Sequence, residues 1–143
     1  MSAIPGTAYL IFPDRLTEKD YTMKLLTLFY ILNATLLLLH EIESAYEKEW
    51  EILKIPGRIT VFLILHIPII LLIFYGLLEI EKQSAQGLRL GIIMGIAGVI
   101  PFLVHKLFVK RKDRFNLPIS NIIIYSNILT GIVTIILSAR LLA

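Results

Sequence analysis

Three histidines are the side chains of this chain best suited to chemistry, and no cysteine accompanies them. His40, His66 and His105 lie in or beside long apolar stretches, where an ionisable side chain is costly and normally faces a bundle interior or a water-filled cavity. Glu43 and Glu47 follow His40 at helical spacing, which places all three on one face of a helix. Neutral imidazoles with a carboxylate are ligands for zinc or non-haem iron. The absence of cysteine excludes thiolate zinc sites, iron–sulfur clusters, disulfides and cysteine nucleophiles.

The elements that position these residues are four apolar stretches long enough to span a membrane. Hydrophobic residues make up 57% of the chain and charged residues 17%, against about 45–50% and about 25% in soluble domains. A bilayer core of about 30 Å needs about 20 apolar helical residues. The predicted spans are approximately 23–39, 59–78, 88–108 and 119–142. We therefore predict an all-α fold, a four-helix transmembrane bundle, with residues 1–143 in a single integral membrane domain.

The first helix is expected to be longer than its span. Thr17 followed by Asp20 resembles a capping box, which predicts a helix start near Glu18. No helix breaker occurs before Pro56. A helix from Glu18 to Lys54 would be about 55 Å long, so its second half would project from the bilayer or bend along its surface.

Hairpin topology brings the three histidines to the same side of the membrane. The first helix reaches this side just before His40, the second starts there about two turns before His66, and the third ends there near His105. We predict a metal site with His40, Glu43, His66 and His105 as ligands and Glu47 as a catalytic base or alternative ligand. Zinc is expected in preference to iron, and a water ligand would have its pKa lowered toward about 7. Three further glutamates are expected to point elsewhere and to be solvated: Glu41, Glu49 and Glu51.

Each member of the predicted site also has a structural explanation. His40 and His105 could be interfacial side chains at span ends, and His66 could hydrogen-bond a carbonyl freed by Pro68. The glutamates belong to a Glu- and Lys-rich amphipathic stretch that could be solvated. A haem held by His66 and His105 is a further alternative, although it leaves the carboxylates beside His40 unexplained. The chain lacks serine-nucleophile motifs, and its single H-x-x-E reverses the E-x-x-H order of di-iron bundles.

Small and polar residues on the last two spans indicate where helices approach closely. Gly91, Gly95 and Gly98 share one face of the third span, which favours close helix packing and could also join two copies of the chain in a homo-oligomer. The fourth span carries a polar seam made of Ser120, Asn127, Thr130, Thr134 and Ser138. Interhelical hydrogen bonds are the expected role of this seam.

Basic residues indicate an orientation for the chain. A dense group lies close to the end of the third span and consists of Lys106, Lys110, Arg111, Lys112 and Arg114. The positive-inside rule then places the histidine-bearing side in the cytoplasm. The same group would attract anionic headgroups, so membrane lipids are expected partners. A formal net charge of +3 is too small to suggest binding to nucleic acid.

The stretch from His40 to Glu51 reads His-Glu-Ile-Glu-Ser-Ala-Tyr-Glu-Lys-Glu-Trp-Glu, and His66 follows Ile55-Pro56-Gly57 in a hydrophobic helix. It resembles small prokaryotic four-helix membrane proteins with a His-Glu-Ile-acidic…Glu-Trp-Glu motif, and also domains of the HXXEE family. It departs from HXXEE because Ser44 follows Glu43, so the paired glutamates are absent. The resemblance implies a protein of a prokaryotic plasma membrane and supports the site without naming a reaction.

Three functions of different classes are compatible with these features, and the third of them is a small transporter whose pathway would form in a homodimer. The first is a metal-dependent enzyme that acts on a lipid or other apolar substrate at the membrane interface. The alternative is a non-catalytic membrane scaffold or assembly subunit whose polar cluster is structural. An enzyme needs an open coordination position and a cavity that reaches lipid or water, whereas the cluster of a scaffold is packed shut.

Overall fold

The computed structural model describes residues 17–108, 115 and 117–143, so residues 110–114 of the predicted basic group lie outside the described part. The described elements are α1 (Glu18–Tyr46), α2 (Glu49–Ile52), α3 (Arg58–Glu81), α4 (Ala85–Phe102), the π-helix η1 (Leu103–Phe108) and α5 (Pro118–Leu142). No strand occurs among the described residues. Helices α1, α3, α5 and α4 with its π-helical extension are long and apolar enough to cross a membrane. The predicted all-α, four-helix membrane bundle is confirmed.

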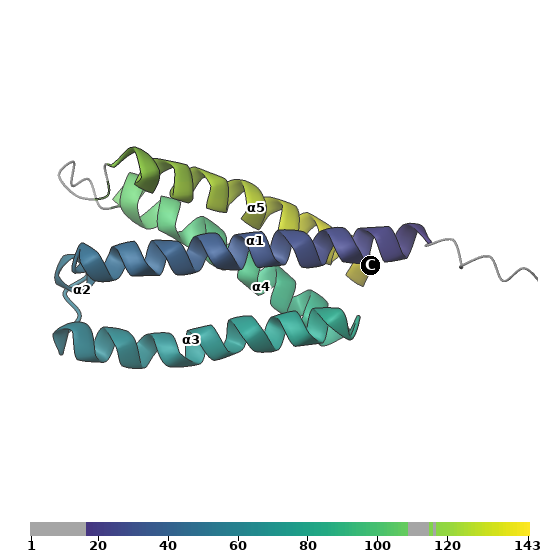
Figure 1. Cartoon of the computed structure of the whole chain (residues 1–143), viewed down its shortest axis with the longest axis horizontal. Helices are drawn as coiled ribbons and strands as arrows, with labels where there is room; N and C mark the ends of the chain where they lie inside the picture. The colour runs from purple at the N-terminus through teal and green to yellow at the C-terminus, as the bar shows by residue number, and fades with distance from the viewer. Residues whose placement is uncertain (1–16, 109–114, 116) are drawn as a thin grey trace, which may run out of the picture.

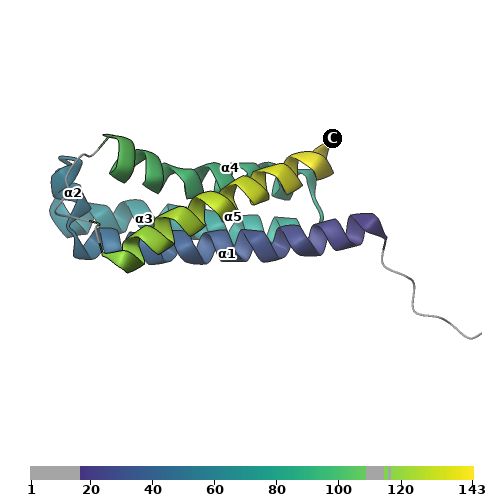
Figure 2. The ribbon, with the colours of Figure 1, turned by 90° about the horizontal axis from the view of Figure 1, so that it is seen from above.

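Helix α1 runs through the middle of the bundle, with α5 on one side and α3 on the opposite side (Figure 1). Helix α4 begins beside α3 and crosses the bundle obliquely, so that it lies along α5 toward the end that carries α2 (Figures 1 and 2). The apolar segment of α3 is the least buried of the four. The bundle therefore consists of a close-packed group, α1, α4 and α5, and of a more peripheral α3.

Glycines allow the backbones of α4 and α5 to touch. A Cβ atom on Gly95 would lie 2.6 Å from the carbonyl oxygen of Gly131, and one on Gly131 would lie equally close to the carbonyl oxygen of Gly95. Gly91 faces Ser138, and Gly98 faces Asn33. The predicted glycine face is thus in contact with residues of the same chain, and the homo-oligomer stays a prediction.

A buried polar node links the three close-packed helices. The side-chain amide of Asn33 on α1 donates to the carbonyl of Met94 on α4 over 2.8 Å. Its oxygen accepts a hydrogen bond from the hydroxyl of Thr130 on α5 over 3.1 Å. The whole predicted seam of α5 is buried, as expected for a face that packs inside the bundle. A polar side chain in an apolar span is costly unless it is hydrogen-bonded. Both the amide group and the oxygen of Asn33 have a partner here.

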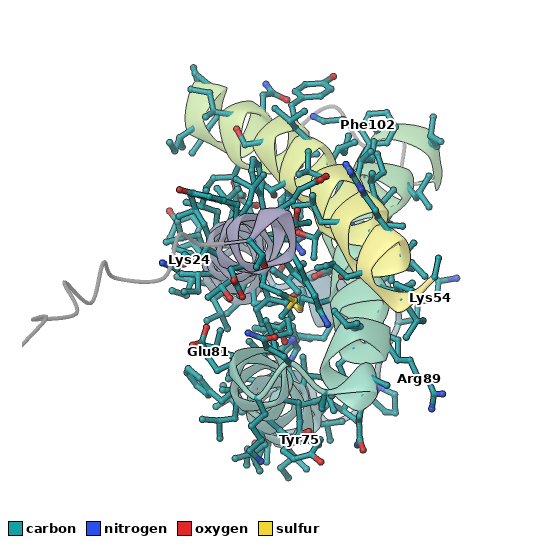
Figure 3. All side chains as sticks on the ribbon, turned by 90° about the vertical axis from the view of Figure 1, so that its right-hand side faces the viewer. Lys24, Lys54, Tyr75, Glu81, Arg89 and Phe102 are labelled. Carbon is teal, nitrogen blue, oxygen red and sulfur yellow. The ribbon has the colours of Figure 1, made fainter. Side chains whose placement is uncertain are left out.

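Helix α3 is tied to α1 by polar contacts along its length. The hydroxyl of Tyr30 donates to the carbonyl of Ile73 over 2.8 Å, and it fits there because Gly76 has no side chain. Nearer the α3–α4 turn, Thr27 donates to Glu81 over 2.9 Å. Viewed from this end, Glu81 lies on the side of α3 that faces α1, whereas Tyr75 lies on the outer side (Figure 3).

The sequence predicts a helix that continues to Lys54, but α1 ends at Tyr46. Its start agrees with the prediction, since Thr17 and the third residue of the helix form a capping box. After α1, Lys48 adopts a left-handed backbone with φ of 53°, and the chain turns into α2. The turn allows Trp50 to pack edge-on against Phe62 of α3, with ring centroids 5.6 Å apart. Burial of this tryptophan outweighs the local preference for a continuous helix.

We expect the substitution Gly95→Ala to lower the stability of the bundle by about 1–3 kcal/mol, because the new methyl group meets backbone atoms that cannot move aside. Ile96→Ala is the matched control, since Ile96 is 51% exposed on the outer face of the same helix. Thermal unfolding in detergent, followed by circular dichroism, measures both. A Gly95→Ala protein as stable as the control would contradict the backbone contact.

Candidate metal centre

Two histidines and one glutamate meet at the end of the bundle that carries α2. His40, Glu49 and His105 each offer one donor atom, and these atoms lie within 4.8 Å of one another. Nε2 of His105 is 3.2 Å from Oε1 of Glu49, and the two imidazole rings are 5.0 Å apart between centroids. The residues are 2%, 9% and 7% exposed, respectively, so the cluster is shielded from the surroundings.

Three different elements deliver these side chains. His40 lies in the last two turns of α1, and Glu49 is the first residue of α2. His105 lies in η1, which follows Pro101 at the end of α4. Proline cannot donate the hydrogen bond that an α-helix requires, and π-helical turns occur often at functional sites. Two irregular segments, the break after Tyr46 and the π-helix, therefore lie at the cluster.

Several polar atoms of the cluster are buried without a hydrogen-bond partner among the described residues. They are Nδ1 of His40, both ring nitrogens of His105 and one carboxylate oxygen of Glu43. The 3.2 Å contact between His105 and Glu49 lacks the alignment of a hydrogen bond. A buried polar atom without a partner costs about 1–3 kcal/mol. A neutral imidazole has one lone pair, so a cation bound here would satisfy one nitrogen of each ring and remove part of this cost.

Glu49 supplies the negative charge of the cluster. Burial raises the pKa of Glu49, but its polar contacts with His105 and Ser44 outweigh burial and bring the pKa below its ordinary value. Glu49 is therefore a carboxylate at neutral pH. The hydroxyl of Ser44 also lies 3.4 Å from Nε2 of His40, so one serine contacts two members of the cluster.

Phe115 covers the cluster on the side of α5. Its ring stacks on His105 with centroids 3.9 Å apart and lies 5.7 Å from the ring of His40. Phe115 is 3% exposed and has a φ of 56°, which is rare for a bulky residue and indicates that packing holds it in place. The ammonium of Lys106 donates to the carbonyl of Phe115 over 3.4 Å and to the side chain of Asn121 over 2.7 Å. These contacts anchor the covering ring.

The structure places His66, a predicted ligand, in a different contact. Its Nδ1 lies 2.6 Å from the carbonyl oxygen of Phe62, and its Nε2 lies 2.7 Å from a carboxylate oxygen of Glu41. The carbonyl that Pro68 frees is that of Ile64, so the bond to Phe62 is not the one that the structural explanation expects. Both ring nitrogens are engaged, so His66 bridges α3 to α1 and has no free lone pair for an ion.

The remaining predicted residues flank the cluster without joining its donor group. Glu43 accepts a hydrogen bond from Ser120 at the start of α5, and its other oxygen lies 4.0 Å from Nδ1 of His40. Glu47 caps the C-terminus of α1 and is half-buried. Neither belongs to the set of described donor atoms within reach of a single ion.

The sequence does not predict two residues of the centre, Glu49 and Phe115. Glu49 is expected to be solvated but is buried, because the chain turns back after α1. The adjacent Trp50 is the one available signal, since a large aromatic residue favours burial of its surroundings. Phe115 follows a polar, basic stretch, and no pattern in the sequence identifies it as a covering residue.

A cavity of about 230 Å³ borders the cluster. Its wall includes His40, Glu49, His105 and Glu41, together with apolar residues of α1, α3, α4 and η1. Two imidazoles and one carboxylate beside an open space form the donor set of catalytic zinc sites, and also of non-haem iron sites with a facial triad. The arrangement can therefore hold a metal ion and leave a coordination position for another molecule.

The comparisons with known proteins give one match. The model of a family of unknown function, DUF6713, matches residues 26–141, a range that contains all three members of the cluster. The match lends no support to membership of the HXXEE family in particular. No curated protein and no solved structure matches significantly.

We expect Phe115→Ala to expose His105. Diethyl pyrocarbonate should modify His105 several-fold faster in this variant than in the wild type, because the stacked ring no longer covers the imidazole. Mass spectrometry of the modified peptides measures the rates. His66 contacts Phe62 and Glu41 instead and serves as a control within the same chain. Equal rates at His105 in both proteins would show that Phe115 does not cover it.

Proposed function

The chain belongs to DUF6713, a family of unknown function, and we propose that it is an integral membrane protein that binds one divalent metal ion through His40, Glu49 and His105. The observation that carries the proposal is the convergence of three buried donor residues, in which Nδ1 of His40 and both ring nitrogens of His105 make no aligned hydrogen bond among the described residues. Other buried polar side chains, such as Asn127, also lack a partner, but only this group combines two imidazoles with a carboxylate among the described residues.

The proposed ligand set keeps two of the ligands predicted from the sequence, His40 and His105, and replaces the other two. Glu49 replaces Glu43 and His66, because Glu49 faces both imidazoles and His66 has neither ring nitrogen free. Glu43 takes a different role. A histidine ligand normally donates its second ring N–H to a carboxylate, and Glu43, whose Oε2 lies 4.0 Å from Nδ1 of His40, would accept this hydrogen bond after moving about 1 Å closer.

Zinc is the proposed ion. Two histidines and one glutamate with an open position hold zinc in hydrolytic enzymes, and this ion needs no redox partner. The same residue types hold iron(II) in facial triads, so the identity of the ion is an outcome of the metal analysis below.

We further propose that the ion serves catalysis on a lipid or other apolar substrate at the membrane interface. The support is the cavity of about 230 Å³ beside the ligands, since an enzyme requires such access. A bound ion would polarise a substrate oxygen or lower the pKa of a bound water toward about 7. The positive-inside rule would place this interface in the cytoplasm.

The alternative is a non-catalytic scaffold in which the polar groups fix helix register. The node of Asn33, Met94 and Thr130 favours it, because its hydrogen bonds link three helices without offering a site. In that case the cluster at the α2 end would bind no ion.

Elemental mass spectrometry tests the metal proposal on protein purified without a metal-affinity column. We expect about one zinc ion per chain, its loss in His105→Ala and its retention in His66→Gln. The second variant alters a histidine at the same end of the bundle that makes other contacts. Circular dichroism checks that both variants fold. Metal-free wild-type protein, or equal metal loss in both folded variants, would contradict the proposed ligand set.

The single tryptophan offers a second, optical test. Trp50 is buried and directly follows Glu49 in α2. We expect cobalt(II) added to metal-stripped protein to quench Trp50 fluorescence saturably, because the ion binds beside the indole. The quenching should weaken at least tenfold in apparent affinity in Glu49→Ala, roughly the cost of losing one ligand contact of about 1.4 kcal/mol or more. Unchanged titration of this variant would exclude Glu49 as a ligand.

A further inference from the structure

The cavity beside the metal centre is one of three that meet inside the bundle. A cavity of about 340 Å³ lies between α1 and α3, and another of about 230 Å³ extends toward Tyr30 and Met94. Leu37 and Ile69 line all three cavities. The three spaces therefore adjoin at one pair of side chains, and together they are called the slot between α1, α3 and α4.

The oblique course of α4 creates this slot. Helix α4 leaves α3 as it crosses toward α5, so α1 and α3 flank a space at the α2 end that α4 does not fill (Figures 1 and 2). Ile42 and Leu63 line the space and are 67% and 55% exposed, which places its mouth between α1 and α3. Both helices are long and apolar enough to cross a membrane, and in that arrangement the mouth would open toward the bilayer.

The polar groups of the slot lie at one end. His40, Glu49 and His105 border the cavity at the metal centre, and the Glu41–His66 pair stands beside the mouth. The opposite end is lined by apolar side chains and by Tyr30, whose hydroxyl is already bonded to a backbone carbonyl. A molecule that fits has an oxygen-bearing head and a long apolar tail.

The proposed ion selects the head. One divalent ion held by one carboxylate and two neutral imidazoles has a charge of +1 over its three ligands, and the Glu43 carboxylate beside His40 offsets this charge. An open coordination position accepts a lone pair, so it favours a carboxylate or ester oxygen over a cationic or purely hydrocarbon group.

From these features we propose that the slot binds a single fatty acyl chain, whose tail lies past Leu37 and Ile69 toward Tyr30 and whose carboxyl-derived oxygen faces His40, Glu49 and His105. This inference rests on the proposed metal-binding function, since it names the class of molecule that the same centre receives. The chain enters from the bilayer between α1 and α3. Ligand sites typically enclose about 300–1,000 Å³ and are mostly apolar with a few polar groups. The largest of the three cavities of the slot, about 340 Å³, falls within this range.

Photo-crosslinking with a diazirine analogue of palmitic acid tests the proposal in detergent micelles. We expect labelling of peptides that carry Leu37, Ile69 and Ala97, and we expect unlabelled palmitate to suppress it. Lipid-facing positions should be labelled without saturation. Labelling that is spread over the outer faces of the helices and that palmitate does not suppress would overturn the proposal.

Matched substitutions on two helices distinguish loss of labelling through a blocked slot from loss of labelling through a damaged fold. Ala97→Phe fills the slot from α4, and Ile96→Phe places the same ring on its outer face. Ile69→Phe and Leu71→Phe form the corresponding pair on α3, where Leu71 is 64% exposed. Saturable labelling should fall several-fold in Ala97→Phe and Ile69→Phe and persist in the two controls. Equal labelling in all four would overturn the proposal.

Metal content measured on the same samples distinguishes the two proposals. Saturable labelling in a protein without metal would contradict the metal centre and leave the acyl slot supported. One ion per chain with unsaturable labelling would overturn the slot and leave the metal centre supported.

Discussion

Water cannot solvate the imidazoles and the carboxylate that α1, α2 and η1 bury at one end of this bundle, so these groups must satisfy one another or bind an ion. At Tyr30 and Asn33 the same constraint is met by protein atoms, since both residues are almost fully buried and have their polar atoms bonded to a neighbouring helix. The side chains of Asn127 and Ser138 on α5 are also buried without a hydrogen-bond partner among the described residues. The cluster differs from them in the kind of groups that it brings together, because two imidazoles and a carboxylate are a set of metal ligands.

Most of the fold could be predicted from the sequence, because membrane spans depend on hydrophobicity summed over about 20 residues rather than on any single contact. Local signals were also sufficient at Thr17, where the capping box fixes the start of α1, and along the glycines of α4, where close packing follows from the absence of side chains. The end of α1 could not be predicted in this way. No breaker precedes Lys48, and the turn depends on the contact of Trp50 with Phe62 of another helix.

The sequence predicts which residues of the candidate site lie at the same depth along the bundle, because this depth follows from the order and direction of the helices. His40 and His105 come together because their helices end on the same side of the bundle. Depth alone does not determine rotation about a helix axis. Adjacent residues of a helix point about 100° apart, so His40 faces His105 while its neighbour Glu41 faces α3 and pairs with His66. Glu49 was missed for a related reason, since a continuous helix carries it away from the face of His40.

The contact between α4 and α5 and the position of α3 have different consequences for the proposed site. Backbone contact between α4 and α5 at Gly95 and Gly131 fixes the frame from which His105 projects, and an ion requires its ligands to be held within narrow limits. Helix α3 contributes no ligand to the cluster and is joined to α1 by separate polar bridges, including the Glu41–His66 pair. Helix α3 nevertheless contacts the segment that carries Glu49, because Trp50 packs against Phe62. In the proposed function, opening of the mouth between α1 and α3 would therefore act on Glu49 through Trp50, while the contact between α4 and α5 holds the helix that carries His105.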